Sequence, residues 1–195
     1  PDPFAGMFPW NMELLIFIDD IRAIEVVGVA QGNAKSAHLL TASWAEAESF
    51  AHQTGFPEHH LVLRPDSEAD PRIRKGIASW ATLEAAFAWA REQSASGRVF
   101  RETDGRAHAN PTRMENIRRA AEEQAKKLCS LCPACSTPGF WIVERVPGLR
   151  CTDCDAPTRE TRAEVHGCLK CAHRETRERT DPPYADPRYC DYCNP

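Results

Sequence analysis

The sequence predicts a layered α/β (or α+β) domain followed by a small metal-binding tail of two zinc ribbons. Apolar, β-branched runs alternate with helical patterns through the first two thirds of the chain. From residue 129 onward, eight paired cysteines and frequent prolines replace continuous apolar sequence. We therefore expect an α/β domain at residues 1–128 and tandem zinc ribbons at residues 129–195.

The first predicted elements are two neighbouring strands, at residues 13–18 (ELLIFI) and 23–30 (AIEVVGVA). The polar residues between them favour a hairpin. Further apolar runs predict strands at 60–65 (HLVLRP) and 98–103 (RVFRET), and the polar stretch at 66–76 predicts a loop.

Three helices are predicted from their start signals. Ser43 opens a capping-box pattern, and the helix it starts should end near Thr54, with Gly55 in the left-handed cap position. Ser79 should cap a second helix that runs to about Gln93 and buries Trp80, Leu83, Phe87 and Ala90.

The third predicted helix begins at Asn110-Pro111, because Asn is a good N-cap and Pro is favoured at the first helical position. Its apolar residues recur at helical spacing and predict a buried stripe of Met114, Ile117, Ala121, Ala125 and Leu128.

Composition limits the class of protein. The chain has 195 residues, 42% of them apolar, and a formal charge of −4. No apolar run is long enough to predict a membrane span, and no signal-peptide pattern is visible. Residues 1–128 hold no cysteine, whereas disulfide-stapled secreted domains spread theirs throughout. We therefore expect metal-held thiolates in a reducing cytoplasm.

The cysteine spacing predicts two zinc sites. Fifteen residues separate the pair Cys132/Cys135 from Cys151/Cys154, and eighteen separate Cys168/Cys171 from Cys190/Cys193. Both halves match the zinc-ribbon spacing, in which two tight turns each aim two sulfurs at one ion. A strand at 140–146 and a turn at Pro147-Gly148 would join the first two pairs as a hairpin. A polar strand at 173–180 is expected in the second half.

Several alternatives stay open at this point. The spacing favours sequential pairing of the cysteine pairs but also permits an interleaved arrangement, first with third and second with fourth. Iron is a less favoured ion than zinc for an S4 site. His166 and His173 should face solvent because the ligand count is already complete, and Cys129 should be a partly buried free thiol.

Charge argues against nucleic-acid binding by the tail. Residues 129–195 hold nine Lys/Arg and ten Asp/Glu. Each Zn(Cys)4 centre would add about two further negative charges, whereas a phosphate-tracking surface should be basic. The arginines at 159–179 alternate with glutamates, which predicts a solvated face.

A polar loop at residues 102–114 (ETDGRAHANPTRM) is the second candidate site, because it joins a strand to a helix N-terminus. Asp104 and His108 are the candidate catalytic residues. The candidate anion-binding residues are Arg106, Asn110, Arg113 and Lys75. Capping and turn formation explain part of this pattern without any function.

The chain resembles an uncharacterised bacterial family, a domain of unknown function. The stretches that carry the resemblance include GFPEH, ETDGRAHANPTRM, CPACSTPGF and the closing CDYCNP. Family members often carry Met where Gly105 stands, and an aromatic residue or His near Ala109, which weakens a catalytic role for His108. The resemblance implies that this chain lacks an N-terminal portion. It also implies, by analogy, a similarity of that upstream portion to nucleoside-triphosphate pyrophosphatases.

Two functions follow from these patterns. The first is a zinc-stabilised protein whose ribbons are structural and provide a docking surface for a protein partner. The alternative is a hydrolase acting on a nucleotide or another phosphorylated substrate, with its anion site in the loop at 102–113.

Overall fold

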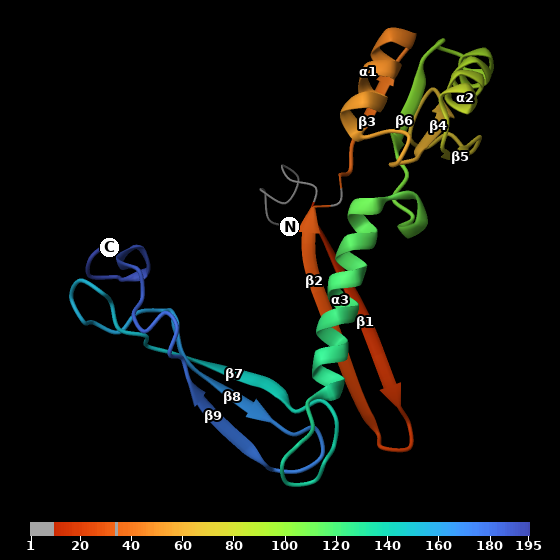
Figure 1. The fold of residues 1–195 in the computed structure, drawn as a ribbon. Helices are drawn as coiled ribbons and strands as arrows, with labels where there is room; N and C mark the ends of the chain where they lie inside the picture. Colours follow the sequence, from red (N-terminus) through yellow and green to blue (C-terminus); the bar gives the residue numbers. More distant parts are fainter. Residues whose placement is uncertain (1–9, 34) are drawn as a thin grey trace. The chain divides into compact units, whose positions relative to one another are not determined.

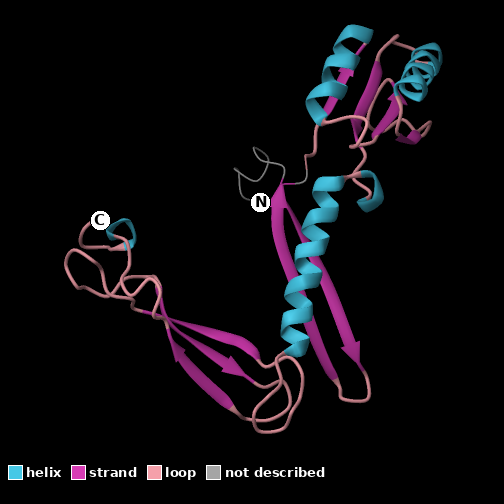
Figure 2. Cartoon of the chain, in the orientation of Figure 1, coloured by secondary structure: helices cyan, strands magenta, loops and turns pink. Residues whose placement is uncertain are grey.

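The computed structural model describes residues 10–33 and 35–195 (Figures 1 and 2). Its contacts divide the chain into two compact units, one built around Val29–Ala121 and the other from Ile16–Gly28 and Glu122–Pro195. The hairpin strands β1 (Trp10–Asp19) and β2 (Ile24–Asn33) and the helix α3 (Pro111–Cys129) run through both units. The boundary at residue 128 therefore stays a prediction.

A four-stranded antiparallel sheet forms the centre of the first unit, in the order β3-β6-β4-β5. Its strands are β3 (His38–Thr41), β4 (Leu61–Pro65), β5 (Arg74–Ile77) and β6 (Val99–Thr103). The prediction of a loop throughout 66–76 is wrong, because β5 begins at Arg74. An edge strand has a partner on one side only, so Arg-Lys-Gly can form it without an apolar pattern.

Two helices cover one face of this sheet, and both begin at the predicted caps. Helix α1 (Trp44–Thr54) starts after Ser43 and ends at Gly55, which has a left-handed φ of 82°. Helix α2 (Trp80–Gln93) starts after Ser79 with a capping box. One cluster of buried side chains joins both helices to the sheet; it includes Phe50, Leu61, Leu63, Leu83, Phe87 and Val99.

Helix α3 begins as predicted, since the Asn110 side chain accepts a hydrogen bond from the Arg113 backbone N–H at 3.0 Å. The predicted apolar stripe is wrong, because Met114 and Ala125 are exposed whereas Asn116 and Ala120 are buried. Asn116 donates to the Asn33 carbonyl at 3.0 Å and to the Asn11 side chain at 2.7 Å. Hydrogen bonds to the hairpin thus orient this face of the helix. None of the helices among the described residues has the length and apolar content that crossing a membrane requires.

The second unit contains an antiparallel sheet of three strands in sequence order: β7 (Trp141–Pro147), β8 (Thr161–Gly167) and β9 (Arg174–Glu178). The strand β8 escaped prediction because charged residues interrupt its apolar ones. Besides cysteines, the buried apolar side chains described in this unit are few, namely Ile24, Val26, Phe140, Leu149, Ala163 and Ala185.

Candidate metal centres

Each of the first two cysteine pairs lies in a tight backbone turn. The Cys132 carbonyl accepts from the Ser136 N–H at 2.8 Å, and the Cys151 carbonyl accepts from the Asp155 N–H at 3.0 Å. Ser136 and Asp155 have left-handed φ values of 57° and 59°. The two turns therefore share one conformation, and its sharp reversal aims both sulfurs of a C-x-x-C pair to the same side.

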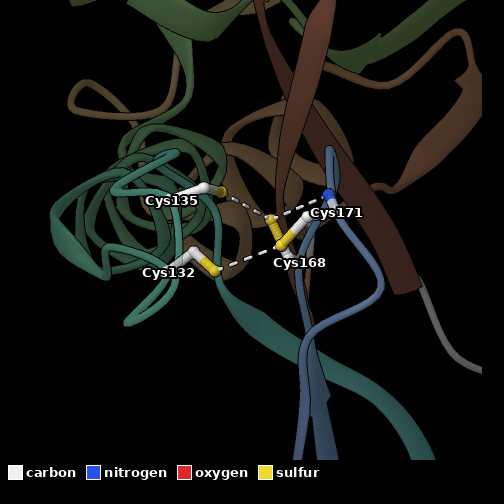
Figure 3. A group of neighbouring side chains, drawn as sticks. All are labelled: Cys132, Cys135, Cys168 and Cys171. Carbon is white, nitrogen blue, oxygen red and sulfur yellow. Dashed lines mark hydrogen bonds between the residues drawn. The ribbon is translucent and has the colours of Figure 1, made fainter.

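The eight paired cysteines come together as two groups of four, and each group could hold a metal ion. The first group joins Cys132 and Cys135 to Cys168 and Cys171 (Figure 3). The second joins Cys151 and Cys154 to Cys190 and Cys193. All nine cysteines are free thiols, with no disulfide between them.

This arrangement is interleaved, so the favoured sequential pairing is wrong. Strand β7 leads away from the first cysteine pair to the second, β8 returns to the third, and β9 leads out again to the fourth. A strand of seven residues spans roughly 23 Å. Consecutive pairs therefore lie at opposite ends of the sheet, and alternate pairs share an end.

The sulfur positions match one tetrahedral ion in each group. The Cys132–Cys171 and Cys135–Cys168 Sγ distances are 3.7 and 3.5 Å, and those of Cys151–Cys193 and Cys154–Cys190 are 3.9 and 3.5 Å. Four sulfurs about 2.3 Å from a central ion are separated by roughly 3.8 Å along each edge of the tetrahedron. Zinc and iron both accept such an S4 set, so the geometry does not choose between them.

Without an ion, the crowded thiols of one group ionise unequally. In the second group, a hydrogen bond from the Cys193 backbone lowers the pKa of Cys190 to about 7. In the same group, the neighbouring Cys154 thiol and burial raise the pKa of Cys193 to about 12. Four adjacent thiolates repel one another, whereas a bound cation stabilises all four. Metal binding should therefore release protons from each group.

Two predictions about neighbouring residues are wrong. His166 is buried, 7% exposed, and lies beside the rings of Phe140 and Trp141. It faces the small apolar interior of the unit because β8 is the central strand. The Cys129 thiol is exposed rather than partly buried, since it is the last residue of α3. His173 is partly exposed and lies 3.2 Å from Glu175.

In the loop at 102–114, Asp104 is buried, and both of its carboxylate oxygens accept hydrogen bonds. Its carboxylate accepts from the Arg106 guanidinium at 2.6 and 2.9 Å and from the Gly76 backbone N–H at 3.0 Å. Burial raises the pKa of Asp104, but the hydrogen bonds from Arg106 and Gly76 outweigh it and hold that pKa below its usual value. These contacts fasten the loop to β5 and leave Asp104 poorly suited to act as a base near neutral pH.

The other cationic candidates have protein partners or lie apart. Arg113 forms an ion pair with Glu13 at 2.7 Å and donates to the Gly105 carbonyl at 2.6 Å. Both Glu13 and Arg113 line a cavity of about 260 Å³, which also contains buried Asn110. His108 and Lys75 are exposed. The anion site stays a prediction, and the Glu13 carboxylate in the same cavity opposes it electrostatically.

Sequence reasoning missed His59, which is buried and contacts the Thr112 hydroxyl at 2.9 Å near the start of α3. A histidine in a polar run before a strand gives no signal for such a contact, because the two residues meet only through the tertiary fold.

Comparison with known proteins agrees with the resemblance noted from the motifs. Searches of curated proteins and of solved structures found no match to this chain. A family model, by contrast, matches residues 1–195 without a gap between the two units. The chain belongs to this family, a domain of unknown function named DUF6671.

Proposed function

We propose that this protein is a zinc-binding protein in which two structural zinc ions hold the cysteine-rich unit in a fixed shape. The observation that carries the proposal is the pair of four-sulfur groups, whose sulfur separations of 3.5–3.9 Å suit a Zn(Cys)4 centre. Each group supplies four protein ligands, so neither ion would keep an open position for a substrate. This favours a structural role over a catalytic one.

Metal analysis of protein purified without added metal tests this proposal. We expect about two zinc ions per chain and loss of one ion when Cys171 or Cys193 is replaced by Ser. The Cys129→Ser variant is the matched control and should keep both ions, because Cys129 belongs to neither group. Iron in place of zinc, or a metal content that the ligand variants leave unchanged, would contradict the proposal.

We propose further that the cysteine-rich unit serves as a docking surface for a protein partner. All three tyrosines of the chain lie at Tyr184, Tyr189 and Tyr192, beside the last cysteine pair, and all are exposed. Exposed tyrosines are enriched at protein interfaces. The nearby arginines are paired with acids, as in Arg159–Asp191 and Arg188–Asp186. Because these arginine charges are neutralised, the surface is better suited to bind a protein than the phosphate backbone of a nucleic acid.

A triple variant, Tyr184→Ser, Tyr189→Ser and Tyr192→Ser, tests the docking surface. It should keep two metal ions, since none of these residues is a ligand. A partner that binds the metal-loaded chain should lose most of its affinity for the variant. A partner with equal affinity for both would place docking elsewhere on the molecule.

A further inference from the structure

The hairpin of β1 and β2 has one face that contacts α3. On this face, the Asn11 side chain of β1 accepts a hydrogen bond from Asn116 of α3 at 2.7 Å, and Asn116 also lies against Gly32 of β2. Glu13, two residues after Asn11, forms its ion pair with Arg113 of the same helix. Side chains alternate between the two faces of a strand. The even-numbered residues of β1 and the odd-numbered residues of β2 therefore lie on the opposite face.

This opposite face, the outer face of the hairpin, is apolar and exposed. Four large side chains of β1 on it are between 54% and 60% exposed, namely Met12, Leu14, Ile16 and Ile18. Val29 of β2 lies on the same face and is 37% exposed. Among the described residues, seven of the fourteen exposed large apolar side chains belong to this hairpin. The exposed apolar surface of the chain is therefore concentrated here.

Polar residues lie at the ends of the outer face, and its centre carries no charge. Glu25 stands close to the hairpin turn, and Gln31 stands close to the other end of β2; both are exposed. An apolar centre with a polar rim is the usual anatomy of a protein–protein interface. Exposed strands that avoid pairing with another chain commonly carry lysine, proline or other charged residues, and the segment from Leu14 to Ile18 carries none.

We propose that the outer face of the hairpin is an interface between two copies of this chain, which pack face to face about a twofold axis. In a twofold dimer the same patch meets itself, so the patch must be self-complementary. An uncharged apolar face meets this condition without a complementary charge on a different partner. Two such sheet faces would pack about 10 Å apart, as in a β-sandwich. The interface uses neither the cysteine ligands nor the tyrosines of the proposed docking surface.

The area of the outer face suits a dimer. Its five large apolar residues expose roughly 500 Å² together, which is close to the largest apolar patch on a typical monomer. A standard interface buries about 800 Å² on each partner, of which the apolar core is one part and the polar rim the other. The outer face therefore supplies most of the area that a stable dimer needs, and its rim residues supply the rest.

Sedimentation equilibrium of the metal-loaded chain tests this interface. A species with twice the mass of one chain is expected, with a dimer Kd on the order of micromolar. Ile16→Glu should raise that Kd by at least about tenfold, because it places a charge from each copy in the apolar centre of the interface. Val143→Glu is the matched control, since Val143 is a 50% exposed residue of strand β7, and it should leave the Kd unchanged.

A second measurement needs no variant and so does not depend on how a variant folds. In a mixed sample of isotope-labelled and unlabelled native chains, methyl NMR should show intermolecular NOEs at Leu14, Ile16 and Ile18. A dimer whose intermolecular NOEs lie only at other residues would overturn the proposal.

Other results of these experiments would also overturn it. A native chain that remains monomeric at about 100 µM has no dimer interface of the expected strength. An equal change of Kd in Ile16→Glu and Val143→Glu would separate dimerisation from the outer face. A native monomer that binds phosphatidylcholine vesicles, when Ile16→Glu does not, would assign this face to a lipid surface instead.

Discussion

The two units of this protein keep their shapes by different means. In the α/β unit, a continuous cluster of buried aliphatic and aromatic side chains joins two helices to a four-stranded sheet. The cysteine-rich unit buries few large apolar residues, and Phe140 is the largest of those that are fully buried. Its described strands β7 to β9 carry many exposed charges, such as Arg145, Arg162 and Arg177.

This contrast predicts which change should destabilise each unit most. A hydrophobic core distributes its stabilisation over many contacts, so one substitution removes a part of it. A fold held by two metal ions would concentrate its stabilisation in a few bonds, so loss of either ion would remove a large part of it. The ion pairs across the small sheet cannot compensate, because exposed pairs contribute little.

Removal of metal should have the largest effect and should separate the two units. Chelation should unfold the region from Ser130 to the C-terminus, since each ion supplies on the order of 10 kcal/mol of folding free energy in zinc-finger peptides. Hydrogen exchange should show lost protection in β7, β8 and β9, with protection retained in β4 and β6. Equal loss of protection in both sheets would mean that the units are not independently stabilised.

Truncation of the hydrophobic core should destabilise the α/β unit and leave the cysteine-rich unit intact. Leu63→Ala removes a fully buried side chain from the α/β unit and should cost about 2–5 kcal/mol. Thermal unfolding of the native and variant proteins, with and without chelator, measures this loss. The metal content of the variant should remain unchanged, and a loss of metal would contradict the comparison.

A glycine substitution should affect the cysteine-rich unit by a steric route. Gly139 has a φ of 89°, and an added Cβ would lie 2.8 Å from Leu169 and 3.0 Å from Val26. We expect Gly139→Ala to cost about 2–4 kcal/mol, from backbone strain and overpacking together. Gly97→Ala is the matched control, because Gly97 also has a positive φ but no atom within 4 Å of the added Cβ. Equal denaturation midpoints for the two variants would remove the steric argument.

The smallest effect should be a loss of stability of the α/β unit at acidic pH. The Asp66 carboxylate accepts hydrogen bonds from the Ser94 and Ser96 side chains and from the backbone of Ala95 and Ser96, which lower the pKa of Asp66. Because the folded-state pKa is depressed, this stabilisation is present above about pH 4 and is lost as the pH falls below it. As the pH is lowered, the amide protection of β4 and β6 against hydrogen exchange should decrease less in Asp66→Asn than in the native chain. Identical pH profiles would exclude this contribution.

Local chemistry made part of the fold predictable. Ser43, Gly55, Ser79 and Asn110 act through residues within one turn, so their sequence signals were sufficient for the helix ends. The turn within each C-x-x-C pair was predictable for the same reason, since two residues between cysteines fit a single turn.

Tertiary features escaped prediction because they depend on partners distant in the sequence. The pairing of the four-cysteine groups depends on β8, whose alternating charges concealed a central strand. The burial of Arg101 depends on the register of β6 against β3 and β4, which no local pattern encodes. The burial of Asn116 also depends on distant partners, because this residue donates hydrogen bonds to Asn11 and Asn33. A polar residue therefore lies on the buried face of α3, where an apolar stripe was expected.

Native mass spectrometry of two double variants gives the most direct test of the central account, that metal–sulfur bonds between alternate cysteine pairs shape the cysteine-rich unit. Cys132→Ser with Cys168→Ser damages one group and should leave a chain with one metal ion. Cys132→Ser with Cys151→Ser damages both groups and should leave none. The reverse result, with one ion kept by the second variant and none by the first, would contradict the interleaved arrangement.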